Sequence, residues 1–148
     1  MPLRRMAPID LGAIVEIEQE SPSPWTPEQI ADELAFAGSV TLVSTDQEEN
    51  VLGWCCARIA GEEAELLKIA VHPEKRRVGS GDALLVYLEN TLKKKGVGML
   101  FLEVRSKNLP ALHFYRKHGF AQVGQRSGYY SDPVDDALIL RKEICDFG

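Results

Sequence analysis

The chain has 148 residues, of which 45% are hydrophobic and 26% are charged. This length and these ordinary globular values favour a single domain over residues 1–148 and exclude disordered, collagen-like and disulfide-rich classes. No apolar run approaches the about 18 residues of a membrane span, and Asp10 interrupts the start before a secretory apolar segment could form. Cys55 and Cys56 are adjacent and Cys145 stands alone, which offers neither metal-ligand spacing nor an even-numbered disulfide framework. We therefore expect a soluble, cytoplasmic protein without a metal site.

Charge is distributed unevenly along the chain. The formal net charge is −5, which argues against general binding to nucleic acid. Residues 1–65 hold 13 acids and 3 bases, a net charge of −10, whereas residues 66–148 hold 9 acids and 14 bases, a net charge of +5. A bound polyanion is therefore expected on the second part. The acidic first part is either a solvated surface or a region that attracts a basic partner.

Two helices are predicted at the start of the chain. Asp10 precedes apolar residues at helical spacing, which predicts a first helix near residues 10–20. In the next segment Thr26 can cap a second helix, Gln29 completes a capping box, and Gly38 marks the end.

Three strands, a helix and a fourth strand are predicted to follow. The runs at 40–44, 51–60 and 64–71 have strand character, and their short polar connections predict antiparallel pairing. Leucines at helical spacing then predict a helix that ends at Gly96. The apolar run at 97–104 predicts a central strand covered by helices on both faces, paired in parallel with the strand before the helix.

The last part of the chain predicts a short helix and two strands. Asn108 can cap the helix, which ends near Lys117, and Gly119 stops it. Strands are expected at 120–125 and 137–143. The expected fold class is α+β, with a mixed, mostly antiparallel sheet flanked by helices and one parallel crossover.

A loop with two glycines joins the third strand to the next helix. Its sequence, Arg76-Arg77-Val78-Gly79-Ser80-Gly81, places free backbone N–H groups and the positive end of a helix dipole where an anion could bind. The spacing lacks the Gly-Lys-Ser/Thr of a P-loop, and Leu84 occupies the place of the third glycine of a dinucleotide fingerprint. The loop suits a pyrophosphate held without magnesium, and a tight structural turn explains two glycines equally well. Asp82 would repel a phosphate if its side chain pointed inward.

Four stretches in chain order carry a resemblance to a known family. They are PWTPEQIADEL, IAVHPEKRRVGSGDALL, LEVRSKNLPALHFYRKHGF and RSGYYSDPVDDALIL. Together they resemble the GNAT N-acetyltransferase superfamily and, within it, the RimI-type alanine N-acetyltransferases of ribosomal protein. The resemblance implies the GNAT fold and acetyl-CoA as co-substrate. It also implies transfer of acetyl to the N-terminal alanine of a small-subunit ribosomal protein, by direct attack in a ternary complex.

The resemblance also implies a coenzyme site. The end of the third strand, at Ile69, Ala70 and Val71, would pair with the pantetheine arm. Asn108 would contact the coenzyme as well as cap its helix. The pyrophosphate would be held by Arg77, Val78, Gly79, Ser80, Gly81 and Asp82.

Glu103 and Tyr115 are the catalytic candidates. Acetyl transfer to an amine needs a base for the amine and an acid for the departing thiolate. By resemblance, Glu103 in LEVR is the general base and Tyr115 in HFYRKHGF is the general acid. From the residues alone, Glu103 is a strand-end carboxylate paired with Arg105, and Tyr115 is a core aromatic.

The acceptor is expected near three aromatic residues. Tyr129 and Tyr130 follow Arg126 in a pattern that resembles the family's Arg-x-x-Tyr-Tyr hairpin, which lies beside the acceptor peptide. An aromatic pair in an ordinary turn is equally compatible with these residues. Trp25 lines the same groove or anchors the second helix in the core.

Some positions depart from the family pattern. Arg76 replaces a common glutamine and Asp82 stands where arginine is frequent, which affects the expected coenzyme contacts. Ile30 replaces an aromatic residue in the second helix and bears on the choice of acceptor, and Asp135-Asp136 replaces Glu-Asp.

Three functions remain open at this stage. The first is N-terminal acetylation of a protein, expected to be a ribosomal protein, by a monomer or weak dimer with no nucleic-acid or membrane partner. The second is a GNAT acetyltransferase for a small-molecule amine, and the third is a non-catalytic acyl-CoA-binding module. The presence of both Glu103 and Tyr115 argues against the third. His72, His113 and His118 share no ligand spacing and are expected on loops and helix surfaces.

Overall fold

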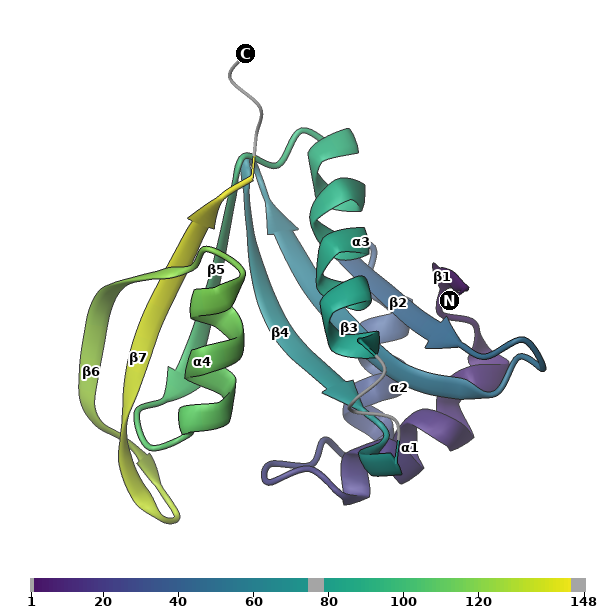
Figure 1. The fold of residues 1–148 in the computed structure, drawn as a ribbon, viewed down its shortest axis with the longest axis horizontal. Helices are drawn as coiled ribbons and strands as arrows, with labels where there is room; N and C mark the ends of the chain where they lie inside the picture. The colour runs from purple at the N-terminus through teal and green to yellow at the C-terminus, as the bar shows by residue number, and fades with distance from the viewer. Residues whose placement is uncertain (1, 75–78, 145–148) are drawn as a thin grey trace.

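A seven-stranded sheet runs through the residues that the structure describes. The computed structural model describes residues 2–74 and 79–144. The strands are β1 (Leu3–Arg5), β2 (Ser39–Thr45), β3 (Val51–Ala60), β4 (Glu63–Val71), β5 (Met99–Arg105), β6 (Ala121–Ser131) and β7 (Val134–Glu143). The helices are the 3-10 turn η1 (Pro8–Asp10), α1 (Leu11–Gln19), α2 (Pro27–Ala35), α3 (Ser80–Lys94) and α4 (Leu109–Lys117). The spatial order of the strands is β1-β2-β3-β4-β5-β7-β6 (Figure 1).

The predicted mixed sheet is confirmed. Neighbouring strands in the described residues pair antiparallel, except for β4 and β5, which pair in parallel and are joined through α3. The sequence analysis missed β1, because three residues with two arginines show no alternation of apolar and polar positions. Among the described residues, none of the helices has the length and apolar character needed to cross a membrane.

The parallel pairing of β4 and β5 is short. Glu63–Glu65 pairs with Met99–Phe101, and beyond this point the two strands diverge into a V (Figure 1). Two adjacent residues of β3, Ala57 and Cys56, pair with Leu66 and Lys68 of β4. Leu67 is therefore an extra residue in β4, a β-bulge that bends the strand. The backbone edge of β4 from Leu66 to Val71 is therefore left without a strand partner on the β5 side.

Helices cover the two faces of the sheet unequally. Helices α3 and α4 lie on one face, and α1 and α2 lie on the other, over β2 to β4 (Figure 1). Along β5 burial alternates: Leu100, Leu102 and Val104 are buried, whereas the residues between them are half-buried. The expectation that helices cover β5 on both faces is therefore wrong, because α1 and α2 do not extend over this part of the sheet.

Several predicted helix boundaries agree with the structure, and one does not. The Thr26 hydroxyl accepts the Gln29 N–H (3.1 Å) and the Gln29 amide oxygen accepts the Thr26 N–H (2.8 Å), which is the predicted capping box. Gly96 and Gly119 have the positive φ expected after a helix. Helix α2 ends at Ala35 and not at Gly38, because Phe36 is already extended and its ring lies 4.4 Å from the Arg58 guanidinium.

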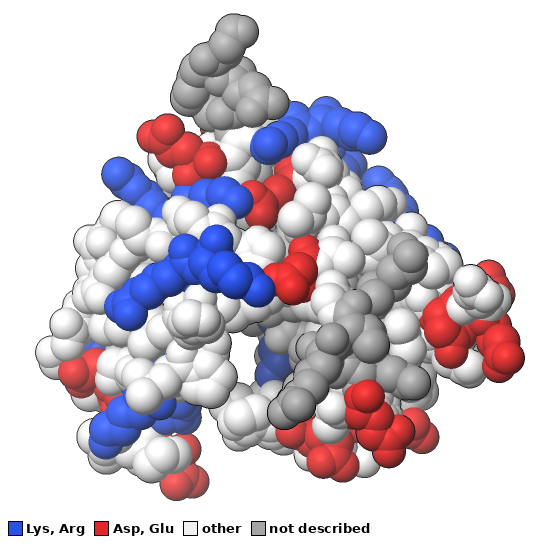
Figure 2. All heavy atoms as spheres, in the orientation of Figure 1, with Lys and Arg blue, Asp and Glu red and all other residues white. Residues whose placement is uncertain are grey.

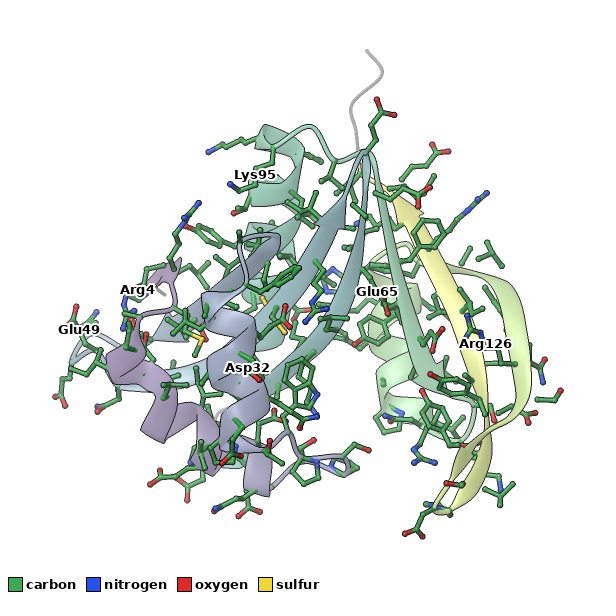
Figure 3. All side chains as sticks on the ribbon, turned by 180° about the vertical axis from the view of Figure 1, so that it is seen from behind. Arg4, Asp32, Glu49, Glu65, Lys95 and Arg126 are labelled. Atoms are coloured by element: carbon green, nitrogen blue, oxygen red, sulfur yellow. The ribbon has the colours of Figure 1, made fainter. Side chains whose placement is uncertain are left out.

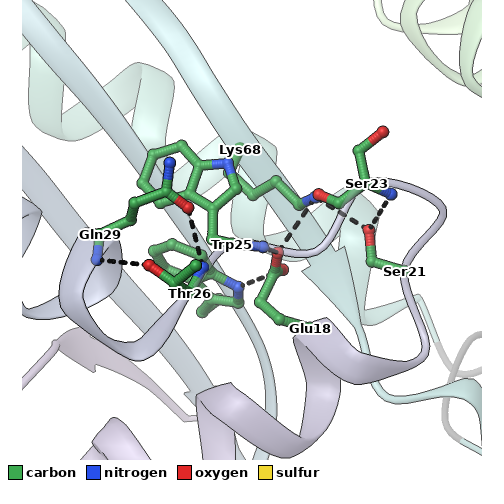
Figure 4. Close-up of polar contacts among 8 residues, drawn as sticks. Glu18, Ser21, Ser23, Trp25, Thr26, Gln29 and Lys68 are labelled. Atoms are coloured by element: carbon green, nitrogen blue, oxygen red, sulfur yellow. Dashed lines mark hydrogen bonds and ion pairs between the residues drawn. The ribbon is translucent and has the colours of Figure 1, made fainter. Parts of the chain in front are cut away.

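A buried carboxylate ties the α1–α2 connection to the sheet (Figure 4). Glu18 is 0% exposed. Its Oε1 accepts the backbone N–H of Trp25 and its Oε2 accepts the indole N–H of Trp54, both at 3.0 Å. Lys68 Nζ, on β4, lies 3.1 Å from Oε1 and compensates the charge. The four groups join α1, the following loop, β3 and β4.

Lys68 also holds the loop directly. Its ammonium donates to the Ser21 hydroxyl and to the Ser23 carbonyl oxygen, both at 2.9 Å (Figure 4). The loop between α1 and α2 is therefore fixed to the bent part of β4 by two hydrogen bonds of a single side chain, beside the ion pair of that side chain with Glu18.

We expect Glu18→Gln to destabilise the fold by about 3 kcal/mol, because it leaves the Lys68 ammonium without its buried counter-charge. Urea unfolding followed by circular dichroism measures the change. Glu16→Gln is the matched control, since Glu16 is exposed on the same helix. Equal stability of the two variants would contradict this role for Glu18.

Candidate active site

A pocket of about 360 Å³ lies where β4 and β5 diverge. It is lined by Ile17, Ser21, Pro22, Ile69, Ala70, Val71, Gly81, Asp82, Ala111, Phe114 and Lys117. These residues come from α1 and its loop, the end of β4, the start of α3, and α4. The surface is hollowed between the side that carries α3 and the side that carries α4 (Figure 2). The predicted strand residues Ile69, Ala70 and Val71 thus line a pocket together with the start of α3.

The start of α3 has the features of an anion site. Gly79 precedes the helix with φ +78, a backbone conformation that favours glycine, and it provides no side-chain cap. The N–H groups of the first helical turn have no partner within the helix. Ser80 is 0% exposed, and its hydroxyl has no hydrogen-bond partner among the described residues. The predicted residues Arg77 and Val78 lie outside the described residues.

Asp82 points towards α4. Its Oδ1 lies 2.6 Å from Nε2 of His118 and 2.9 Å from Nζ of Lys117. The hydrogen bonds from His118 and then from Lys117 hold the pKa of Asp82 below its usual value. The carboxylate is thus neutralised by α4. His118 is 13% exposed and forms an interhelix contact, so its expected place on the helix surface is wrong.

Glu103 lies on β5, on the face opposite to α4. Its Oε1 is 3.6 Å from Nη2 of Arg126, on β6, and its side chain is 25% exposed. Arg105 donates instead to the backbone carbonyls of Pro133 (2.8 Å) and Asp132 (3.2 Å). The pairing of Glu103 with Arg105 that the sequence left open is therefore replaced by a contact with Arg126.

Glu65 is a neighbour of Glu103 that the sequence analysis missed. Glu65 pairs with Phe101 in the parallel register, so it lies on the same face as Glu103. Desolvation and then the negative charge of Glu103 raise the pKa of Glu65. Figure 3 shows Glu65 and Arg126 on either side of β5. The alternation of side chains along β4 and β5, combined with the parallel register, would have predicted that the two carboxylates lie on the same face.

Tyr115 approaches from the other face. It is half-buried and packs against the core cluster that contains Leu100, Leu102 and Val104. Its ring is edge-on to Phe114 at 5.4 Å and to Phe120 at 5.6 Å. Desolvation raises the pKa of Tyr115, with a smaller contribution from Cys55, so the phenol keeps its proton at neutral pH. Glu103, on β5, and Tyr115, on α4, therefore lie on opposite faces of the sheet.

Asn108 and Asp135 order the connection between β5 and α4. The Asn108 side-chain oxygen accepts the Ala111 N–H at 3.3 Å, which confirms the predicted cap. Asp135 Oδ1 accepts the hydroxyl of Ser106 at 2.5 Å, and Oδ2 accepts the backbone N–H of Lys107 at 3.2 Å. Asp135, one of the departures from the family pattern, thus fixes the turn that leads into α4.

The aromatic candidates for acceptor binding separate into two groups. Tyr129 and Tyr130 lie on β6, and their rings are edge-on to each other at 5.1 Å. The Arg105 guanidinium lies 4.1 Å from the Tyr130 ring, and the Arg126 guanidinium lies 5.4 Å from the Tyr129 ring. The two tyrosines therefore lie beside Glu103 and its partner. Trp25 is half-buried, edge-on to Trp54 at 5.6 Å, and packs against the core cluster that contains Ile14, Ile17 and Ile30.

A second pocket, of about 520 Å³, lies on the α2 face near Glu65. Its lining combines apolar side chains with two carboxylates. The lining residues are Phe36, Arg58, Ile59, Ala60, Glu63, Ala64, Glu65 and Phe101. Arg58 is paired with Glu33 at 2.7 Å, so the carboxylates of Glu63 and Glu65 leave this pocket acidic.

Sequence comparison finds relatives over most of the chain. Residues 11–120 match the acetyltransferase (GNAT) family. The [ribosomal protein bS18]-alanine N-acetyltransferase of Escherichia coli K12 is 35% identical over 91% of this chain and 92% of its own length.

The fold is similar to solved structures of N-acetyltransferases. The ribosomal-protein-S18-alanine N-acetyltransferase from Escherichia coli superposes with a TM-score of 0.89 and 31% identity, over 99% of this chain and 96% of that one. An aminoglycoside 6′-N-acetyltransferase complexed with coenzyme A superposes with a TM-score of 0.86 over 100% of this chain and 99% of that one. Its identity is 16%, so this likeness concerns the fold alone.

Neither described cysteine is placed as a nucleophile. Cys55 and Cys56 are both 0% exposed. Burial raises the pKa of Cys55 to about 12, and burial also raises the pKa of Cys56. No cluster of three or more His, Cys, Asp or Glu in residues 2–74 and 79–144 is arranged to hold a metal ion.

We expect Cys55 and Cys56 to react with iodoacetamide at pH 8 at least about 100-fold more slowly in the folded protein than in urea, because the thiols are buried and protonated. Mass spectrometry of the labelled peptides measures both rates in a Cys145→Ser background. Fast labelling of Cys55 under native conditions would show that this thiol is accessible and would reopen covalent catalysis.

Proposed function

The chain belongs to the acetyltransferase (GNAT) family, and we propose that it transfers the acetyl group of acetyl-CoA to the N-terminal α-amine of a protein. The proposed acceptor is the N-terminal alanine of a ribosomal protein. One observation supports this chemistry: Glu103 on β5 and Tyr115 on α4 lie on opposite faces of the sheet, in the half that diverges from β4. One face thus offers a base to an incoming amine, and the other offers an acid to a leaving group.

The residues around the first pocket fit acetyl-CoA. The unpaired edge of β4 at Ile69, Ala70 and Val71 can hydrogen-bond the amides of a pantetheine arm, as a neighbouring strand would. The N–H groups at Ser80 and Gly81, with the unpartnered Ser80 hydroxyl, suit the pyrophosphate. Asp82 contributes through its backbone, since its carboxylate is occupied by α4. When bound, the coenzyme supplies an activated acetyl thioester.

Glu103 acts as the base in this proposal. An α-amine has a pKa near ~8, so a mild base suffices to remove its proton, directly or through a water molecule. The Arg126 guanidinium, 3.6 Å from the carboxylate, restrains its orientation. Amine attack is then direct, because Cys55 and Cys56 are buried and protonated.

Tyr115 acts as the acid. Because its pKa is raised, the phenol carries a proton at neutral pH. The edge-on contacts of its ring with Phe114 and Phe120 restrain the orientation of the side chain. It donates that proton to the departing sulfur as the amide forms. Protonation makes the coenzyme sulfur a better leaving group.

The acceptor approaches on the α2 face. Glu63 and Glu65 make the second pocket acidic, and Tyr129 and Tyr130 lie at the other side of Glu103. A basic N-terminal segment suits this surface, and ribosomal proteins are basic because they bind RNA.

Release of free thiol from acetyl-CoA tests the acceptor class. We expect turnover with peptides that begin with Ala followed by basic residues, and little turnover with Ser, Met or Gly starts or with free polyamines. Acetylation of small amines alone would place the acceptor among small molecules. Coenzyme binding without turnover of any peptide or of intact ribosomal protein would support a binding module instead.

Tyr115→Phe should lower kcat by about 100-fold or more and leave the Kd for acetyl-CoA within about threefold, because the hydroxyl acts on the leaving group. Glu103→Gln should lower kcat similarly. Calorimetry and initial rates separate the two quantities. Tyr87→Phe and Glu143→Gln are the matched controls, because they make the same substitutions at residues away from the place where β4 and β5 diverge. Parallel losses of binding and turnover in Tyr115→Phe would indicate a packing role.

A further inference from the structure

We propose that Asp82 is a positioning residue: through His118 and Lys117 it holds α4, and with it Tyr115, against the start of α3. This inference rests on the proposed role of Tyr115. It differs from the role that the sequence suggested for Asp82, which was to hold the coenzyme pyrophosphate.

The fold needs a connection at this place. The two halves of the sheet are paired at one end of the V, over Glu63–Glu65 and Met99–Phe101. At the open end, α3 belongs to the β4 half and α4 belongs to the β5 half (Figure 1). The contacts from Asp82 to Lys117 and His118 span the halves beside the first pocket, whose lining includes both Asp82 and Lys117.

Two ring contacts connect His118, the partner of Asp82, to Tyr115. The His118 ring lies 2.6 Å from the carboxylate through Nε2 and packs against Phe114 at 4.8 Å. Phe114 is in turn edge-on to Tyr115 at 5.4 Å. A displacement of His118 therefore acts on Tyr115 through one intervening ring.

The start of α3 packs on the same ring. A Cβ placed on Gly81 would lie 3.5 Å from Phe114, so the helix backbone approaches the aromatic side chain closely. Asp82 thus contacts α4 through its carboxylate, and the adjacent Gly81 leaves the helix backbone close to the Phe114 ring. The catalytic phenol and the predicted phosphate site are in this way parts of one packed unit.

Two simpler roles for Asp82 give different results. If the carboxylate merely repels the coenzyme phosphates, then Asp82→Asn tightens coenzyme binding and leaves kcat unchanged. If it merely complements the dipole of α3, then its loss lowers thermal stability without affecting turnover. Since the Asp82 side chain is 45% exposed, its effect on stability is small in either case.

The positioning role predicts a fall in kcat. We expect Asp82→Asn to lower kcat about tenfold, because a misplacement of a catalytic group by a fraction of an ångström reduces its efficiency. His118→Gln keeps a donor at the position of Nε2 and should lose less. The double variant Asp82→Asn/His118→Gln should lose less than the two single losses combined, because both changes act on the contact between Asp82 and His118. Asp32→Asn, on the exposed face of α2, is the control.

A readout without turnover separates this inference from the proposed function. The ring resonances of Tyr115 in NMR spectra, assigned by their loss in Tyr115→Phe, should shift in Asp82→Asn and remain in place in Asp32→Asn. Unchanged resonances, unchanged kcat with tighter coenzyme binding, or additive losses in the double variant would each overturn the positioning role. Shifted resonances in an enzyme that acetylates none of the acceptors would support it and reject the proposed function.

Discussion

The site depends on the point at which β4 and β5 stop pairing. Parallel strands normally continue their ladder, and here an extra residue at Leu67 bends β4 away after Glu65. The bend leaves a strand edge without a protein partner, opens the pocket, and makes both faces of the sheet accessible at one place. Without it, Glu103 and Tyr115 would be separated by a continuous sheet.

Because β4 and β5 pair over only three residues, other contacts are needed near the divergence, and two polar clusters provide them. Glu18 and Lys68 fix the α1–α2 loop to the bent part of β4, and Ser21 of that loop lines the first pocket. On the opposite side, Asp82 joins α3 to α4. One cluster is buried and contributes to stability, whereas the other is half-exposed and contributes to alignment.

Local signals in the sequence predicted most elements, and contacts between distant residues were out of reach. The Thr26–Gln29 box and Gly96 act within a few residues, so their patterns are sufficient. The end of α2 depends on Arg58, which is more than twenty positions away. Likewise, the family pattern singled out Glu103, but its partner Arg126 comes from β6 and follows from the fold alone.

The outer edges of the sheet differ from its inner one. At one side β1 has three residues, and at the other the register of β6 shifts near Gln122 and Arg126, so neither presents a long regular edge. Short or irregular outer strands discourage intermolecular pairing. The edge of β4 between Leu66 and Val71 has neither protection. Under the proposed mode of binding, the coenzyme covers this edge and occupies the place at which a strand of a second chain could otherwise pair.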